Sequence, residues 1–193
     1  MKYLLAVDLE TTGLDPNYNE IIQVAAMLLD ANMNEIDRFF ALVSPVYPDR
    51  ALRFNKDGTV FNAFEYSHRP LSEYKNTGEV IDNVIARMEY HLFTCRNITE
   101  KRQVTLFGQN VKFDESFLKA AYEKTNRSWE FDYHVLDLCS MYASVHCRKH
   151  GSLPTNLGLK DILATLGVEH TLLHDAMEDV KATVRAGQIL CKR

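Results

Sequence analysis

The sequence predicts an α/β domain with a mixed β-sheet, because three consecutive strand patterns are followed by strands that alternate with helices. Only turn-forming residues separate the early strands, which predicts antiparallel pairing. Helical crossovers join the later strands, which predicts parallel pairing. With 193 residues and 46% hydrophobic content, the chain can form one well-packed core, and we expect a single domain over residues 1–193.

The first half of the chain contains three strand patterns and one irregular segment. Tyr3–Val7 is apolar and β-compatible, and Ile21–Asp30 and Ile36–Ser44 follow after turn-forming residues. Residues 45–76 combine prolines, charges and isolated aromatics without a period, so we expect an irregular surface excursion of unassigned role. A helix is then expected from Asn76. Its core-facing stripe comprises Val80, Ile81, Val84, Ile85, Met88 and Leu92.

The second half alternates strands with helices, and Gly167 is expected to end one of the helices. No internal repeat or low-complexity tract interrupts it. The expected elements are a strand over 104–107, a helix with Phe113, Phe117, Leu118 and Ala121 on its inner face, a strand near 133–136, and helices over 138–148, 159–166 and 175–190.

Composition limits the function classes. The net charge of −4 is unusual for a protein that holds nucleic acid by covering many phosphates, so a polyanionic substrate should be gripped over a short footprint with metal ions adding positive charge. The four cysteines are scattered, which argues against a zinc site or a disulfide framework. The N-terminus lacks a signal-peptide pattern and no apolar run reaches membrane-span length, so we expect a soluble, cytoplasmic protein.

Two carboxylates spaced two residues apart end the first apolar run. Because successive strand residues point to opposite faces, Asp8 and Glu10 should emerge on one side while Leu9 points to the other. Two acids on one face repel each other unless a cation lies between them, and a divalent metal is a usual partner. For an isolated Asp-x-Glu pattern, solvent-facing charges at a strand end are the alternative interpretation.

Three further residues offer related chemistry. Asp114 is expected just inside a helix that follows a short strand, and ligands gather at such junctions in α/β sheets. His174 is expected at the mouth of the last helix, with Asp179 one turn inside it. Each of them, taken alone, also fits a structural role, since acids near a helix start favour the helix macrodipole.

Three motifs combine these residues in a fixed order. They are Asp8-x-Glu10-Thr11-Thr12-Gly13, Gln109-Asn110-x-x-Phe113-Asp114 and His174-x-Ala176-x-x-Asp179. Together they resemble the motifs of the DEDDh (DnaQ-like) 3′-5′ exonuclease family, which includes polymerase proofreading exonucleases, ribonuclease T and oligoribonuclease. The resemblance spans nearly the whole chain, although residues 45–103 carry no motif. It implies a ribonuclease H-like fold, which agrees with the predicted element order.

The resemblance also implies a mechanism. Asp8, Glu10, Asp114 and Asp179 would bind two Mg²⁺ or Mn²⁺ ions, with Asp8 bridging them, and His174 would be the general base. Nearby cations disfavour a charged imidazole, which helps to keep His174 neutral near neutral pH. The product would be a 5′-mononucleotide released from the 3′ end of single-stranded nucleic acid, with DNA slightly favoured over RNA. A polymerase partner is compatible with the resemblance, and the sequence does not indicate an oligomeric state.

Substrate contacts are implied at three further positions. The backbone of Thr11 would contact the terminal nucleotide, and Leu14 would wedge against the last bases or simply pack. Asn110 would either orient the site or cap a helix. Basic residues near the late loop could touch phosphates, although a solvated surface is the favoured interpretation. These are Arg148, Lys149 and Lys160.

Three rival functions remain in view. An RNA-directed exoribonuclease of the oligoribonuclease type would use the same motifs. An inactive exonuclease fold that binds nucleic acid or protein would not require all four acids and the histidine. The pair His174-Asp175 also resembles the HD pair of metal phosphohydrolases, but that reading leaves Asp8 and Glu10 unexplained.

Overall fold

A five-stranded mixed sheet in the order β3-β2-β1-β6-β7 forms the centre of the computed structural model, which describes residues 2–55, 57, 59–170 and 174–192. Strand β2 pairs antiparallel with both β1 and β3, whereas β6 pairs parallel with β1 and β7. Both features confirm the predicted mixed sheet. The strands are β1 (Tyr3–Thr11), β2 (Ile21–Asp30), β3 (Glu35–Leu42), β6 (Val104–Gly108) and β7 (Val135–Asp137).

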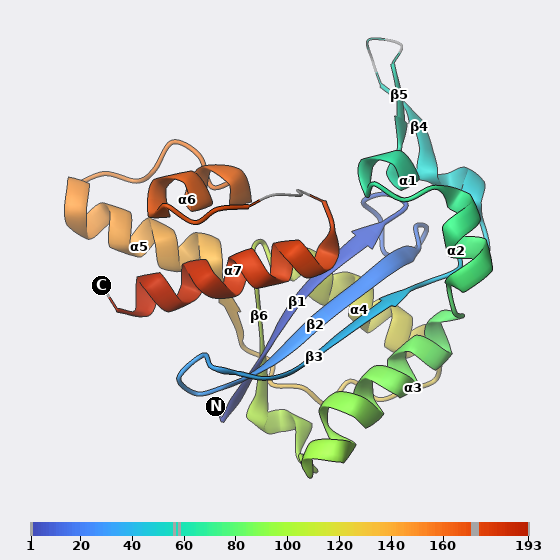
Figure 1. Cartoon of the computed structure of the whole chain (residues 1–193), viewed down its shortest axis with the longest axis horizontal. Helices are drawn as coiled ribbons and strands as arrows, with labels where there is room; N and C mark the ends of the chain where they lie inside the picture. The colour runs from blue at the N-terminus through green and yellow to red at the C-terminus, as the bar shows by residue number, and fades with distance from the viewer. Residues whose placement is uncertain (1, 56, 58, 171–173, 193) are drawn as a thin grey trace.

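Helices cover both faces of this sheet (Figure 1). Helices α3 (Ile81–Leu92) and α4 (Lys112–Lys124) share one hydrophobic cluster with the sheet. A second cluster on the other face includes residues of the remaining long helices. These are α5 (Leu138–His150), α6 (Leu159–Leu166) and α7 (Ala176–Cys191).

Strand β1 shows how the sequence selects these faces. Leu5, Val7 and Leu9 belong to the cluster under α3 and α4, while Leu4 and Ala6 belong to the cluster under α7. This alternation follows the two-residue period of a strand. The side chains of residues 8 and 10 therefore continue on the face covered by α7.

The carboxyl end of β1 is only partly paired. Its parallel pairing with β6 runs from Tyr3 to Ala6, whereas the antiparallel pairing with β2 continues to Thr11. The register with β2 shifts between Glu10 and Thr11. One side of the strand thus opens from residue 7 onward, at the sheet edge where α/β proteins commonly bind ligands.

Residues 45–76 are more ordered than the expected irregular excursion. They form short elements whose apolar residues pack with Ile22 and Leu42 in a small third cluster. The elements are too short to leave a helical or strand period in the sequence. They are η1 (Pro48–Ala51), β4 (Leu52–Phe54), β5 (Val60–Asn62), α1 (Ala63–Tyr66) and α2 (Leu71–Thr77).

The expected helix start at Asn76 is wrong. Asn76 lies in α2, and α3 begins at Ile81 after an extended break. At this break Glu79 donates its N–H to the Leu42 carbonyl, and its own carbonyl accepts from Ser44, so the backbone pairs with the end of β3. A Cβ on Gly78 would lie 2.3 Å from the Tyr74 carbonyl oxygen, which explains the glycine.

Other boundaries differ by a few residues. Strand β1 extends past Val7 to Thr11, and α5 continues beyond Arg148 to His150. Tyr133, which was expected in a strand, is 80% exposed and precedes β7. Two short helical turns, η2 (Thr94–Arg96) and η3 (Lys101–Gln103), precede β6. Within the described part of the chain, none of the helices has the length and apolarity needed to cross a membrane.

Candidate active site and metal centre

A cleft of about 560 Å³ lies at the carboxyl end of β1. Figure 1 shows this end of β1 between α6 on one side and the hairpin β4–β5 on the other. The structure brings all five residues of the predicted catalytic set into the cleft lining. They are Asp8, Glu10, Asp114, His174 and Asp179.

Asp8 and Glu10 come from consecutive same-side positions of β1. Asp8 lies opposite Ala25 and Glu10 opposite Gln23 in the register with β2. Both side chains are partly exposed in the cleft, whereas Leu9 between them is buried in the opposite core cluster. The strand period therefore places two carboxylates side by side while the intervening leucine anchors the strand.

Asp114 reaches the same cleft from the first turn of α4. Its side chain is 3% exposed, and its Oδ1 accepts a hydrogen bond of 2.9 Å from the backbone N–H of Leu9. Because Leu9 lies between Asp8 and Glu10, this bond fixes the third carboxylate directly to the strand that carries the first two. The sheet and the α4 start are thereby joined at the site.

The start of α7 supplies Asp179 and His174. Asp175 is the N-cap, and its carboxylate accepts from the N–H groups of Met177 and Glu178, each at 3.2 Å. Asp179 is 6% exposed, and its Oδ2 accepts from the His174 N–H at 3.1 Å. His174 has a left-handed φ of 65°, which turns the chain sharply into the helix.

The carboxylates shift one another's pKa values. Partial burial raises the pKa of Asp8 well above its usual range, and the charges of Asp114, Asp179 and Glu10 raise it further. Burial, together with Asp179 and Asp114, raises the pKa of Glu10 to about 8. Burial also raises the pKa of Asp114 to about 8, against the Leu9 hydrogen bond. All the carboxylates of such a site are ionised together only when a bound cation offsets their mutual repulsion.

The donor set fits a divalent cation. One ligand atom each from Glu10, His174 and Asp179 lies within 4.8 Å of the others. In the described part of the chain, Oδ1 of Asp179 is buried without an aligned hydrogen bond. Carboxylate oxygens are the ligands preferred by hard cations such as Mg²⁺ and Mn²⁺. The residues present therefore suit an oxygen-rich metal centre.

His174 faces the cleft beside an aromatic ring. Its imidazole lies against Tyr66, with ring centroids 3.8 Å apart and planes inclined by 30°. Burial lowers the pKa of His174 below its usual 6.5, and His68 and His170 lower it further. The imidazole is therefore mainly neutral at neutral pH, as a general base requires.

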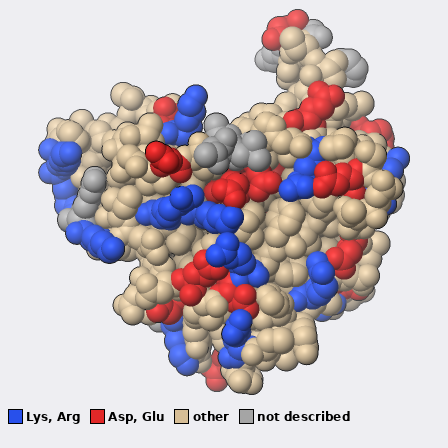
Figure 2. Space-filling model, viewed as in Figure 1, with Lys and Arg blue, Asp and Glu red and all other residues tan. Residues whose placement is uncertain are grey.

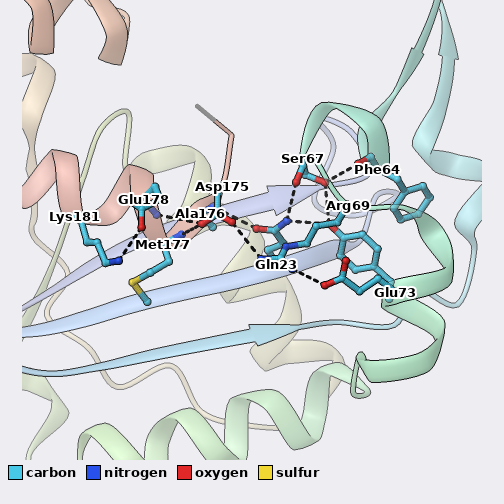
Figure 3. A network of polar contacts seen from close by, with 11 residues as sticks. Gln23, Phe64, Ser67, Arg69, Glu73, Asp175, Ala176, Met177, Glu178 and Lys181 are labelled. Carbon is cyan, nitrogen blue, oxygen red and sulfur yellow. Dashed lines mark hydrogen bonds and ion pairs between the residues drawn. The ribbon is translucent and has the colours of Figure 1, made fainter. Parts of the chain in front are cut away.

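A network of polar contacts links the start of α7 to residues 67–74 (Figure 3). Gln23 is fully buried on β2, donates to the Ser67 carbonyl and the Tyr74 hydroxyl, and accepts from the Ala176 N–H. Arg69 reaches Oδ2 of Asp175 at 3.3 Å. The network ties residues 67–74 to the helix that carries Asp179.

Residues 45–76 contribute a wall that sequence patterns did not reveal. Arg53, Phe61 and Tyr66 line the cleft. The Arg53 guanidinium lies 4.3 Å from the Phe61 ring centroid, and the Phe61 and Tyr66 rings are 5.0 Å apart. Interleaved aromatic and basic residues were the available signal, but they come from three short elements without a common period.

The predicted substrate contacts lie at the same cleft. Thr11, Leu14 and Asn110 line it, and Leu14 is 70% exposed, so it does not serve as a core residue. Asn110 has φ 56° and does not cap α4, whose N-cap is Val111 without a side-chain cap bond. The capping alternative for Asn110 is therefore wrong.

Among the basic residues of the late loop, only one lies at the site. Lys160 lines the cleft at the start of α6, whereas Arg148 and Lys149 are exposed at the end of α5. On the face shown in Figure 2, lysines and arginines are interspersed with acids rather than forming one continuous basic track. This distribution agrees with the net charge of −4 and a short footprint.

The fold and the acidic cleft define a ribonuclease H-like domain, and solved structures support this class. The chain matches exonuclease I over 100% of its length with a TM-score of 0.76 and 24% identity, and it covers 41% of that protein. E. coli exonuclease I in complex with a dA16 oligonucleotide matches with a TM-score of 0.75 and 24% identity, again over 41% of that chain.

Sequence comparisons find similarity to an exonuclease family and to two curated proteins. The Exonuclease (RNase T) family model matches residues 5–56. An oligoribonuclease of Corynebacterium diphtheriae is 27% identical over 72% of this chain and 62% of its own length. A PolC-type DNA polymerase III of Lacticaseibacillus paracasei is 26% identical over 77% of this chain but only 9% of its own length.

The chain is thus similar to the Exonuclease (RNase T) family over residues 5–56, and it shares the fold of exonuclease I. It spans less than two thirds of the length of these relatives. The matched region of the family model contains Asp8 and Glu10 but not the other three members of the acidic site.

We expect the metal-free protein to lose stability as the pH rises from about 4.5 to about 8. Glu10 and Asp114 have folded-state pKa values raised to about 8, so the folded protein holds these protons more tightly than the unfolded chain. Their stabilising contribution is complete below the unfolded pKa and is lost as the pH rises through the folded value. Thermal melts in EDTA across this range should show a falling melting temperature.

Saturating Mg²⁺ should reverse this trend, because a bound cation favours the ionised carboxylates. Glu10→Gln should reduce the slope in EDTA. A melting temperature in EDTA that rises with pH would contradict the repulsion among the four acids.

Proposed function

We propose that this protein is a metal-dependent 3′-5′ exonuclease that releases 5′-mononucleotides from single-stranded nucleic acid. The observation that carries the proposal is the convergence of four carboxylates and one neutral histidine in a single cleft. These residues come from β1, α4 and the start of α7, which are far apart in the sequence. A surface that only binds nucleic acid has no need for such a costly cluster of acids.

Four residues would hold two divalent cations, Mg²⁺ or Mn²⁺, with Asp8 shared between them. Asp8 is suited to the shared position because its pKa is raised by all three of the other acids. When bound, such ions activate a water molecule and neutralise charge on the phosphodiester and its leaving oxygen. The other three ligands would be Glu10, Asp114 and Asp179.

His174 would take the proton of the attacking water. It lies just before the N-cap of α7, beside Glu10 and Asp179, and its lowered pKa keeps the imidazole neutral. Tyr66 limits the rotation of the imidazole by stacking on it. The pKa of the Tyr66 hydroxyl is raised by burial and by Glu10 and Asp179, so this tyrosine is unsuited to act as the base itself.

The terminal nucleotide would bind where the cleft is lined by apolar and backbone groups. Leu14 would contact the last bases, and the Thr11 backbone would contact the terminal sugar or phosphate. In the bend after β1, Thr11 Oγ1 donates a hydrogen bond of 2.6 Å to the Gly13 carbonyl. A side chain on Gly13 would lie 2.6 Å from Asn19, which favours glycine at this position. Asn110 would orient the scissile phosphate.

The preferred nucleic acid is proposed to be single-stranded DNA. The complex of exonuclease I with a dA16 oligonucleotide supports this choice through fold likeness. Short RNA is the second candidate, because the oligoribonuclease of C. diphtheriae is similar over 72% of this chain. Association with a polymerase is a further proposal, supported by the PolC-type relative.

Side-by-side digestion tests the activity and the substrate class. End-labelled single-stranded DNA, RNA and di- to pentanucleotides would be incubated with Mg²⁺ or with EDTA. We expect Mg²⁺-dependent stepwise loss of 5′-mononucleotides from the 3′ end, fastest on DNA. Faster hydrolysis of short RNA would select the oligoribonuclease type, while binding without any release would select an inactive module.

We expect Phe61→Ala to raise the KM for single-stranded substrates with a smaller effect on kcat. Phe61 lines the cleft and its ring lies against Tyr66, so we expect the ring to stack on a base of the substrate. Loss of one base-stacking ring costs about 1 to 3 kcal/mol. Steady-state kinetics on single-stranded DNA measure this.

Tyr90→Ala is a matched control, because Tyr90 is a 63% exposed aromatic on α3 and does not line the cleft. Equal KM values for Phe61→Ala and the intact protein would contradict a contact between the β4–β5 hairpin and the substrate.

A further inference from the structure

His170 is a second histidine beside the acidic site, and the sequence motifs do not include it. Its side chain is 6% exposed, and Nε2 lies 2.7 Å from Oδ1 of Asp179. Neither nitrogen of the ring has an aligned hydrogen bond to another described residue. A buried imidazole without another polar partner is costly unless the contact with Asp179 compensates it.

Each oxygen of Asp179 thus has its own partner. Oδ1 contacts the His170 ring, while Oδ2 accepts from the backbone N–H of His174. His170 therefore contacts one oxygen, and the backbone of His174, just before α7, binds the other. His170 and the His174 hydrogen bond lower the pKa of Asp179, against the burial that raises it.

His170 contacts the Asp179 carboxylate from outside the described lining of the cleft. His174 lines the cleft, but His170 is not among the described residues that do so. In the described part of the chain, the group able to share one cation comprises Glu10, His174 and Asp179, without His170. A direct ligand or a second general base would have to face the cleft and the other acids.

We propose that His170 is a positioning residue that orients the Asp179 carboxylate for metal binding. The inference rests on the proposed function, because it assigns Asp179 as a metal ligand. Groups that hold a ligand from behind restrict its rotation, and their loss typically lowers metal affinity about 10- to 100-fold. Since Asp179 also accepts from the His174 backbone, the contact additionally fixes the start of the helix that presents the proposed base.

Calorimetric titration of the intact chain with Mn²⁺ tests this role without requiring turnover. His170→Phe retains the ring volume but removes both nitrogens, and we expect it to raise the Kd for Mn²⁺ about 10- to 100-fold. His170→Gln places an amide near the position of Nε2 and should retain most of the affinity. His134→Phe is the matched control, because His134 pairs with Asp132 at 2.9 Å on the exposed surface.

A double-mutant cycle separates positioning from general stability. If His170 acts through Asp179, His170→Phe should have no further effect on Mn²⁺ affinity in an Asp179→Asn background. An equal loss in both backgrounds would overturn the inference. Melting in EDTA checks folding, and if His170→Phe does not fold, His170→Gln should still bind Mn²⁺ more tightly than the shorter His170→Asn.

The outcomes also separate this inference from the proposed function. Weakened Mn²⁺ binding in Asp179→Asn, with unchanged binding in His170→Phe, would reject only the role of His170. Unchanged Mn²⁺ binding in Asp179→Asn would reject the proposed metal site, and the role of His170 with it.

Discussion

Replacing Asp8 with asparagine should lower the rate of nucleotide release by at least about 10³-fold, which corresponds to several kcal/mol of lost transition-state stabilisation. Asp8 is the acid whose pKa is raised by every other carboxylate of the cluster, so it is central to the site. The amide retains the shape of the side chain but removes the charge that would hold both cations. Mg²⁺-dependent release of mononucleotides from end-labelled DNA measures the effect.

The same substitution should raise the melting temperature in EDTA, because it removes one of four mutually repelling acids. This distinguishes loss of catalysis from loss of folding. Asp49→Asn is the matched control, since Asp49 is an exposed acid in η1 outside the cleft lining. Full activity of the Asp8→Asn protein would reject the two-metal proposal.

Replacing His174 with glutamine should lower kcat by about 10² to 10⁴, the usual contribution of a positioned general base. Burial and the neighbouring histidines lower the pKa of His174. In the intact protein, the rate should therefore fall with decreasing pH only below about 6.5, where the imidazole becomes protonated. The variant should lose this acid limb in a pH profile measured at saturating Mg²⁺.

The acid limb is the diagnostic result, because a histidine that only packs against Tyr66 would leave it in place. His150→Gln is the matched control at an exposed position of α5. If His174→Gln retained the acid limb at a reduced rate, another group would be the base.

Periodic stretches of the sequence were sufficient to predict the sheet and the helices that cover it. The strand at Ile21–Asp30 and the helix at Leu159–Leu166 match the structure, since each has a strong apolar pattern and a turn or glycine at its end. Alternation along β1 also correctly placed Asp8 and Glu10 on one face. Local patterns suffice here because each element is long enough to show its period.

The sequence by itself determined which residues form the acidic site, because three motifs in a fixed order name the four acids and the histidine. Only the tertiary structure decided what surrounds them. Arg53, Phe61 and Tyr66 reach the cleft from elements of three or four residues, too short to show a period. His170 contacts Asp179, although the motifs do not include this histidine. Such contacts depend on packing between distant segments, which no local pattern records.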